Sequence, residues 1–238
     1  MKRLILLWIF MLLFSSFTAI PQVNSETPPL SEVEAKKQFA LMFLERILEI
    51  NVSAYVLNFS YTYTGEMYGY DEIWNFNINL TRESENLTSN FMFIHGYMVE
   101  ARCYSTEPLS IRQGKTILTV AGEVLESYML NFNASYCSQF IQFLDQVVPD
   151  QNQTIRIGDL VLYVSANGQD LGWAYSPNDI RCMEKSFFIY IPNDKYMIEI
   201  VDHWGIYPIG STEINISKEQ AINIALPYIQ QYVQEKTA

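Results

Sequence analysis

Residues 55–63 read Tyr-Val-Leu-Asn-Phe-Ser-Tyr-Thr-Tyr, with an aromatic or aliphatic side chain at every second position. Residues 74–80 read Trp-Asn-Phe-Asn-Ile-Asn-Leu and alternate in the same way. Successive side chains of a strand point to opposite faces, so this period of two predicts strands with one apolar and one polar face. A third, longer strand is predicted for Phe91 to Cys103. A sheet of such strands needs helices over its apolar face, so we expect an α+β fold.

Three Ser-x-x-Glu/Gln steps predict where helices begin. They are Ser31 with Glu34, Ser110 with Gln113, and Ser217 with Gln220. In such a capping box each side chain pairs with a backbone N–H that the first helical turn leaves free. Each serine is followed four positions later by a small residue. We interpret the steps as a degenerate repeat of a helix that packs closely on a sheet.

The second half of the chain repeats the order of helix and strand. The predicted segments are helices at 117–131 and 136–148 and strands at 160–165, 171–175, 186–191 and 196–201. Asn167-Gly168 between two of these strands is a strong hairpin signal, because both residues tolerate positive φ. We therefore predict two helix-on-antiparallel-sheet units, 26–107 and 108–210, and a C-terminal helix within 211–238.

Residues 214–225 read Ile-Asn-Ile-Ser-Lys-Glu-Gln-Ala-Ile-Asn-Ile-Ala and resemble the opening of PepSY domains, with a fainter echo at 31–35. The resemblance implies a PepSY/cystatin-like helix-on-sheet fold outside the cytoplasm. It also implies a partner such as a peptidase, which these domains are thought to inhibit or chaperone, and no catalytic residues. Pro227 departs from the pattern by interrupting the helix. Because the chain ends at Ala238, either the last helix packs on the second sheet or a third unit is truncated.

The first residues predict export. Two basic residues precede an apolar run from Leu4 to Phe14, which is the layout of a secretory signal. Val23 and Ser25 place small residues at positions −3 and −1, so we expect a signal peptide at 1–25 that is cleaved after Ser25. The alternative is an uncleaved membrane anchor, because weaker apolar character continues to Ile20. We expect a secreted or cell-surface protein with no later membrane span.

Composition excludes two broad classes. The 238 residues include 15 Lys+Arg and 26 Asp+Glu, a formal net charge of −11, and cleavage after Ser25 would make it −13. Apolar residues make up 49%, enough for a packed core, so a disordered chain is excluded. So acidic a chain lacks the clustered Lys and Arg that bind phosphate, and we expect no nucleic-acid partner.

Seven Asn-x-Ser/Thr sequons occur, where chance pairing predicts about two. They lie at Asn51, Asn58, Asn79, Asn86, Asn133, Asn152 and Asn215. The excess predicts N-glycosylation of an exported protein, and the alternative is accidental matches in an Asn-rich and Thr-rich β protein. Asn58 and Asn79 are the favoured sites, because both fall on the polar faces of predicted strands.

Three cysteines, Cys103, Cys137 and Cys182, remain after signal cleavage. Export favours one disulfide and one odd thiol. Three pairings are possible, and we favour Cys137 with Cys182, which lie in the same half of the chain. Cys103 and Cys182 each follow an arginine, which could lower the pKa of a thiol, but a core or disulfide role is the expected one.

No catalytic motif stands out. His95 and His203 are the two histidines, and neither belongs to a His-Glu-x-x-His or Cys-x-x-Cys zinc pattern. His95 is expected on a strand face with Phe93, Tyr97 and Val99, as a half-buried structural residue. Serine-hydrolase, P-loop and dinucleotide motifs are also missing from the sequence. We expect no catalytic residue, no metal site and no cofactor.

Aromatic residues around a glycine-containing turn are candidate binding residues, namely Tyr61, Tyr63, Tyr68, Tyr70 and Trp74. Exposed tyrosines can stack on sugars or anchor a partner peptide. We therefore expect an exported, non-enzymatic binding protein of the cell envelope, with a protein or cell-surface partner. Two alternatives stay open: a secreted hydrolase whose site is assembled from scattered residues, and a structural surface-layer component.

Overall fold

A computed structural model describes residues 28–65, 72–165, 169–192 and 196–206, together with Ser217, 219–220, 222–227 and Ile229. The chain divides into Met1–Tyr207 and Pro208–Ala238, and each is described by itself. The predicted signal peptide and the Asn167-Gly168 turn lie outside the described residues. None of the helices in the described part is both long and apolar enough to cross a bilayer.

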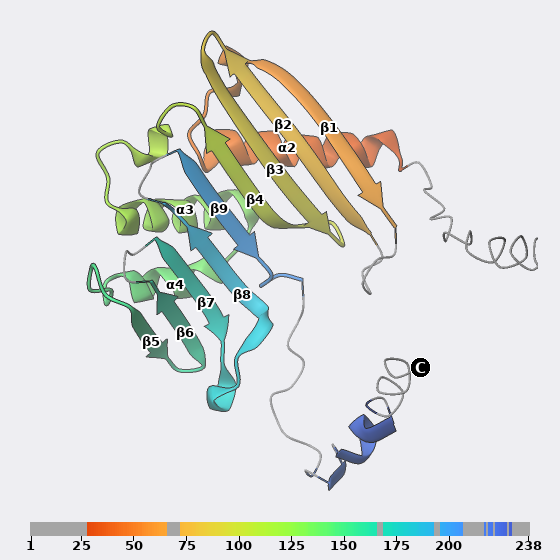
Figure 1. Cartoon of the computed structure of the whole chain (residues 1–238), viewed down its shortest axis with the longest axis vertical. Helices are drawn as coiled ribbons and strands as arrows, with labels where there is room; N and C mark the ends of the chain where they lie inside the picture. The colour runs from red at the N-terminus through yellow and green to blue at the C-terminus, as the bar shows by residue number, and fades with distance from the viewer. Residues whose placement is uncertain are drawn as a thin grey trace, which may run out of the picture. The chain divides into compact units, whose positions relative to one another are not determined.

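Nine antiparallel strands form one sheet in the order β1-β2-β3-β4-β9-β8-β7-β6-β5 (Figure 1). They are β1 Val56–Thr64, β2 Ile73–Arg82, β3 Glu85–Ile94, β4 Tyr97–Ser105, β5 Gln153–Ile157, β6 Leu160–Val164, β7 Asp170–Tyr175, β8 Cys182–Tyr190 and β9 Met197–Asp202. The first four strands form one meander and the last five another. The two meanders join through β4 and β9, where Arg102 pairs with Glu199. Strands of both predicted units therefore share a single sheet.

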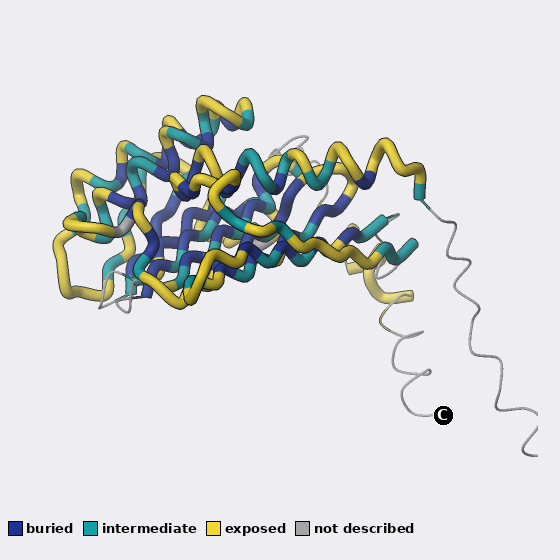
Figure 2. Tube along the Cα trace, turned by 90° about the horizontal axis from the view of Figure 1, so that it is seen from above, coloured by how far each residue is buried: buried dark blue, intermediate teal, exposed yellow. Residues whose placement is uncertain are grey.

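Three α-helices, α2 Leu30–Arg46, α3 Ile117–Phe132 and α4 Cys137–Leu144, pack on one face of this sheet (Figure 1). The ring contacts that tie them to the strands join Phe43 with Phe91, Tyr128 with Phe187, and Phe140 with Trp173. The short helices η1 Val52–Ala54, η2 Ser110–Arg112 and η3 Pro177–Asp179 occur in connections. Figure 2 shows the buried residues concentrated between the helices and the strands. The α+β class predicted from the sequence is confirmed.

One of the three predicted capping boxes forms. The backbone N–H of Ser217 donates to Gln220 Oε1 at 2.7 Å, and the N–H of Gln220 donates to Ser217 Oγ at 3.2 Å. In the first helix Ser31 lies inside α2, which begins at Leu30 after Pro29, and no side chain caps it. That prediction was wrong because proline, with its fixed φ, can open a helix without a capping hydroxyl.

The predicted box at Ser110 was also wrong. Ser110 begins only the short η2, and its hydroxyl donates to the carbonyl oxygens of Leu48 and Glu49. The cap of α3 is Thr116, whose hydroxyl accepts the N–H of Thr119 at 3.2 Å. The Ser110 hydroxyl thus makes a tertiary contact to the end of the first helix. It does not make the local capping hydrogen bond that the motif predicted.

The run predicted as one strand, Phe91 to Cys103, is a hairpin of β3 and β4 with His95-Gly96 as its turn. Both turn residues have positive φ, +50° and +78°, which matches the right-handed twist of paired strands. His95 is therefore exposed in a turn, and its predicted place on a strand face was wrong. The strand β5 was not predicted either, although Ile155 and Ile157 alternate with polar residues.

Gly96→Ala is expected to destabilise the fold by about 1 kcal/mol, because an L side chain is strained at φ +78°. Gly65→Ala is the matched control. An added Cβ meets nothing within 4 Å at either position, and Gly65 has no unusual φ, so only backbone strain separates the two variants. Urea unfolding measures both free energies, and equal values for the two variants would contradict the assigned turn.

Candidate functional site

A hollow of about 320 Å³ lies where the two halves of the chain meet, and we call it the Asp202 pocket. Its aromatic lining consists of Phe39, Tyr97, Tyr128, Phe132 and Tyr136. α2 and β4 of the first half supply Phe39 and Tyr97, whereas the other three residues belong to α3 or precede α4. The pocket therefore exists only when both halves are folded onto one another.

The Asp202 carboxylate lies at the end of β9 and is only 6% exposed. Its Oδ2 accepts the Tyr128 hydroxyl at 2.9 Å and also the Tyr136 hydroxyl. Its Oδ1 accepts the backbone N–H of Trp204 at 2.9 Å. Burial raises the pKa of Asp202, and the three donated hydrogen bonds oppose that rise because they stabilise the ionised form. A hydrogen-bonded carboxyl group thus forms part of the pocket wall.

Local chain geometry explains why two tyrosines reach one oxygen. Asn133 ends α3 in the left-handed conformation, with φ +55° and ψ +31°. Asparagine tolerates this conformation better than most residues, and it reverses the chain within a few positions. Tyr128 in the last turns of α3 and Tyr136 at the start of α4 are therefore brought to the same carboxylate.

The tyrosine hydroxyls and the cysteine thiol near Asp202 keep their protons. Burial raises the pKa of Tyr128 and Tyr136, and the nearby carboxylate raises both further. Burial likewise raises the pKa of the Cys137 thiol. Lys185 donates to the Trp204 carbonyl oxygen, and burial lowers its pKa while Asp202 opposes that change. The pocket thus offers hydrogen-bond donors, aromatic faces and one carboxylate, and no readily ionised nucleophile.

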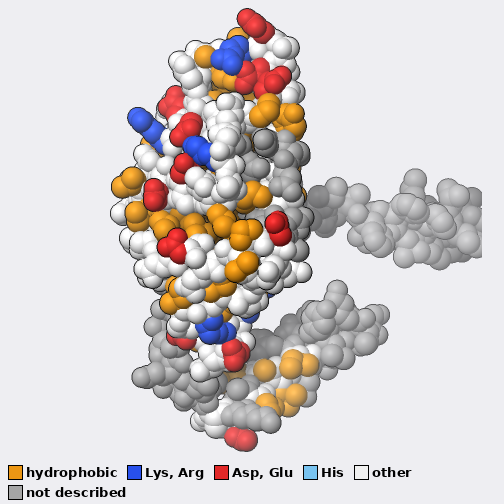
Figure 3. All heavy atoms as spheres, turned by 90° about the vertical axis from the view of Figure 1, so that its left-hand side faces the viewer, with side chains coloured by type: hydrophobic (Ala, Val, Ile, Leu, Met, Phe, Trp, Pro, Cys, Tyr) orange, Lys and Arg blue, Asp and Glu red, His pale blue; other side chains and the backbone are white. Residues whose placement is uncertain are grey.

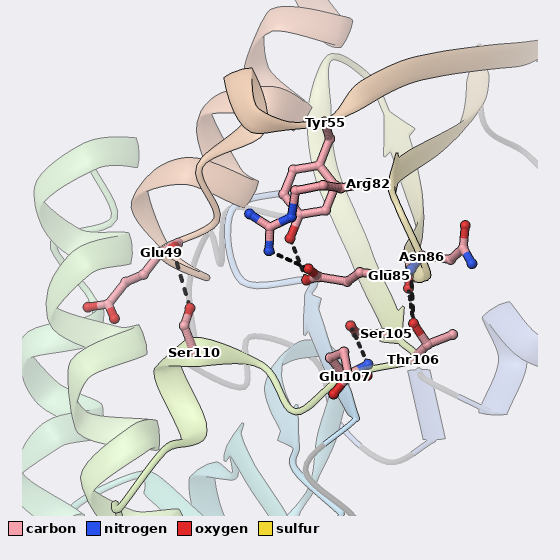
Figure 4. A network of polar contacts seen from close by, with 9 residues as sticks. All are labelled: Glu49, Tyr55, Arg82, Glu85, Asn86, Ser105, Thr106, Glu107 and Ser110. Atoms are coloured by element: carbon pink, nitrogen blue, oxygen red, sulfur yellow. Dashed lines mark hydrogen bonds and ion pairs between the residues drawn. The ribbon is translucent and has the colours of Figure 1, made fainter.

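A second hollow, of about 350 Å³, lies beside the β2–β3 turn, and Figure 4 shows the polar contacts among residues around it. In it Glu85 accepts the Tyr55 hydroxyl and pairs with Arg82, whose guanidinium also lies over the Tyr55 ring. Ser110 Oγ donates to the Glu49 carbonyl oxygen at 3.3 Å. These contacts link three loops near the protein surface. We call this hollow the polar cleft, and we interpret its contacts as structural because they hold the three loops together.

The contacts of Tyr55 in the polar cleft lead us to expect that the stability of the fold changes at alkaline pH. Burial and the hydrogen bond to Glu85 raise the pKa of Tyr55 to about 12, above the ordinary value of about 10. The folded state then holds this proton more tightly, so the contribution is complete below about pH 10 and is lost as pH rises through 12. We expect the difference in unfolding free energy between the wild type and Tyr55→Phe to shrink over that range. A difference that stays constant from pH 9 to 12 would contradict the assignment.

The three cysteines are free thiols in the structure, and the expected Cys137–Cys182 disulfide is not formed. Cys137 is buried at the start of α4, whereas Cys182 is half-buried at the start of β8. Burial raises the pKa of Cys103 to about 12. Arg102 does not offset this, because it lies on the opposite face of β4 and pairs with Glu100 and Glu199.

The predicted binding aromatics are divided by the structure. Trp74 is fully buried, with its ring under Lys36 Nζ and 4.7 Å from that of Tyr63. Tyr61 stacks along Phe76 on the helix-facing side of β1 and is 38% exposed. Tyr68 and Tyr70 lie outside the described residues. Trp74 therefore belongs to the core, whereas a binding role for the partly exposed Tyr61 stays a prediction.

Six of the seven sequon asparagines lie in the described residues. Asn51, Asn58, Asn86, Asn133 and Asn152 are exposed. Asn79 pairs with Asn58 on the face away from the helices, and its amide donates to Asn77 and accepts from Thr88. Asn215 lies outside the described residues. Both favoured sites do lie on the polar face, and whether any site carries a glycan stays a prediction.

The face drawn in Figure 3 and the described His, Cys, Asp and Glu side chains give no further site. The face drawn in Figure 3 mixes acidic, basic and hydrophobic side chains, as a solvated surface does. In the part of the chain that the structure describes, no three His, Cys, Asp or Glu side chains are grouped to hold a metal ion. Sequence reasoning did not single out Asp202 as a candidate site residue. It missed the carboxylate itself, because its partners lie 66 and 74 residues away in the chain.

No family model matches the chain, and no curated protein matches it either. The solved structure of the Bacillus megaterium YpeB C-terminal domain is similar, with 11% identity over 79% of this chain and 73% of that one. Its TM-score is 0.35. The resemblance of residues 214–225 to PepSY domains therefore stays a prediction.

Proposed function

We propose that the chain is an exported, N-glycosylated, non-catalytic binding protein, and that the Asp202 pocket is its binding site. The observation that carries the proposal is a hollow with five aromatic residues in its wall and the carboxyl group of Asp202, a residue that is only 6% exposed. Pockets with mainly apolar walls and a few polar groups are typical of ligand binding. The raised pKa values of Cys103 and Cys137 leave both thiols protonated, which speaks for binding without covalent chemistry.

Export and glycosylation rest on the sequence. The basic and apolar start with small residues before position 26 supports secretion, and the exposed sequon asparagines support modification. A secreted or surface location would bring the pocket into contact with envelope components. The peptidase partner implied by the PepSY resemblance is a finer form of the same proposal.

Native mass spectrometry of the protein secreted by its host tests the binding function. We expect a bound small molecule on the wild type and its loss from Ala134→Phe, which fills the pocket with a bulky ring. Ala54→Phe, at an exposed position in η1, is the control. Equal adducts on both variants, or release of a chemically altered ligand, would contradict a non-catalytic binding role for this pocket.

A further inference from the structure

We infer that the Asp202 pocket binds a small alkylated ammonium ion, a tertiary or quaternary amine. This inference rests on the proposed binding function and names the chemical class of its ligand. It joins three features of the pocket: the charge of its wall, the aromatic character of that wall, and the hydrogen-bonding capacity that the carboxylate has left.

The charge of the wall favours a cation. Asp202 is the acidic side chain of the lining, and among the described residues the lining includes no Lys or Arg. Lys185 and His203 act on the Asp202 charge from outside the lining, and Lys185 also donates to the Trp204 carbonyl oxygen. A buried carboxylate is costly unless positive charge is near it. A cationic ligand in the hollow would lower that cost further.

The aromatic wall favours an organic cation. Phe39 and Phe132 lie with ring centroids 4.4 Å apart, and the Phe132 ring is 5.1 Å from that of Tyr128. Tyr97 and Tyr136 complete the aromatic lining. Aromatic faces attract cations through their quadrupole, and cages of such rings are a known solution for quaternary ammonium groups. Cation–π attraction and burial of alkyl groups would therefore act together.

The hydrogen-bonding capacity that Asp202 has left favours an alkylated amine over a primary amine. A carboxylate has about four acceptor sites, and Asp202 already accepts three hydrogen bonds. A primary ammonium brings three N–H donors and would find about one free site on this carboxylate. A tertiary or quaternary ammonium needs one such site or none. The volume of about 320 Å³ fits a small ligand of this kind.

Isothermal titration calorimetry with choline and its neutral isostere 3,3-dimethylbutan-1-ol tests the inference on the mature, unglycosylated chain. The two probes share their shape and differ in charge. We expect choline to bind at least tenfold more tightly than the alcohol. Equal affinity for the two would overturn the cation inference and leave the binding function intact. Absence of choline binding would also overturn it, whatever adduct native mass spectrometry finds.

Two variants and two controls connect binding to the pocket. Asp202→Asn keeps the shape and removes the charge, so choline affinity should fall at least tenfold. Glu126→Gln makes the same charge change at an exposed position of α3 and should leave affinity within twofold. Tyr97→Ala removes a wall residue that is 55% exposed, and Tyr104→Ala, 42% exposed on the same strand, is its control. Equal effects of Tyr97→Ala and Tyr104→Ala would overturn the assignment, even if Asp202→Asn fails to fold.

The same headgroup could come from a free amine or from a lipid. Flotation with phosphatidylcholine vesicles, with phosphatidylglycerol vesicles as the reference, separates the two sources. Choline binding without vesicle binding supports a free amine. Binding to phosphatidylcholine vesicles that free choline competes away supports a lipid headgroup. Vesicle binding that choline does not reduce would overturn the pocket as the site of ammonium recognition.

Discussion

Phe140→Ala is expected to lower the free energy of unfolding by about 4 kcal/mol, the range for removal of a buried phenylalanine ring. Phe140 is fully buried in α4. Its ring centroid lies 4.9 Å from that of Trp204, 5.4 Å from that of Trp173 and 5.5 Å from that of Phe187. The side chain thus joins α4 to β7, β8 and the segment after β9. Urea unfolding followed by circular dichroism measures the loss.

Phe59→Ala is the matched control for this substitution. Phe59 is 39% exposed on the edge strand β1, so its truncation should cost about 1 kcal/mol. A loss below about 2 kcal/mol for Phe140→Ala, or equal losses for the two variants, would contradict the placement of α4 on the second meander.

Asp202→Ala is expected to cost about 2–3 kcal/mol. Two tyrosine hydroxyls and the Trp204 N–H would lose their acceptor, and a buried unsatisfied donor costs about 1–3 kcal/mol. Relief of the buried charge offsets part of this loss. Asp202→Asn should cost less than Asp202→Ala, because an amide oxygen in the place of Oδ2 still accepts from both tyrosine hydroxyls, while the Trp204 N–H loses its acceptor to the amide NH2.

The sign of the pH dependence follows from the raised pKa of Asp202. A carboxyl group whose pKa is raised in the folded state stabilises the fold fully at pH values below its unfolded-state pKa of about 3.9. This contribution is lost as the pH rises through the folded-state pKa. The wild type should therefore gain stability relative to Asp202→Asn as pH falls toward 4. A wild type that loses stability relative to Asp202→Asn over that range would contradict a burial-dominated carboxyl group.

Most strands and helices were predictable, because the spacing of apolar side chains along the sequence indicates which of the two a segment forms. Residues 55–63 and 74–80 alternate in the sequence, and they form β1 and β2. The hairpin of β3 and β4 was missed because His95-Gly96 is a weaker turn signal than Asn-Gly. The joining of β4 to β9 brings together residues about 100 positions apart, and no local pattern predicts such a pairing.

The candidate site was not predictable for the same reason. Tyr128, Tyr136 and Asp202 are ordinary members of two helical segments and a strand in the sequence. They become a site because the sheet places the end of β9 beneath the turn between α3 and α4. The sequence instead drew attention to histidines and cysteines, whose chemistry is familiar, but the fold buries Cys103 and Cys137 and places His95 in a turn.

A crystal structure of the mature protein with arsenocholine tests the central claim most directly. In arsenocholine, arsenic replaces the ammonium nitrogen of choline. Its anomalous signal locates the cation without any need to interpret the shape of the ligand's electron density. The account predicts one strong peak inside the Asp202 pocket, between the carboxylate and the rings of Tyr97, Tyr128 and Tyr136. A peak at another site, or an empty pocket in a crystal soaked with excess ligand, would contradict it.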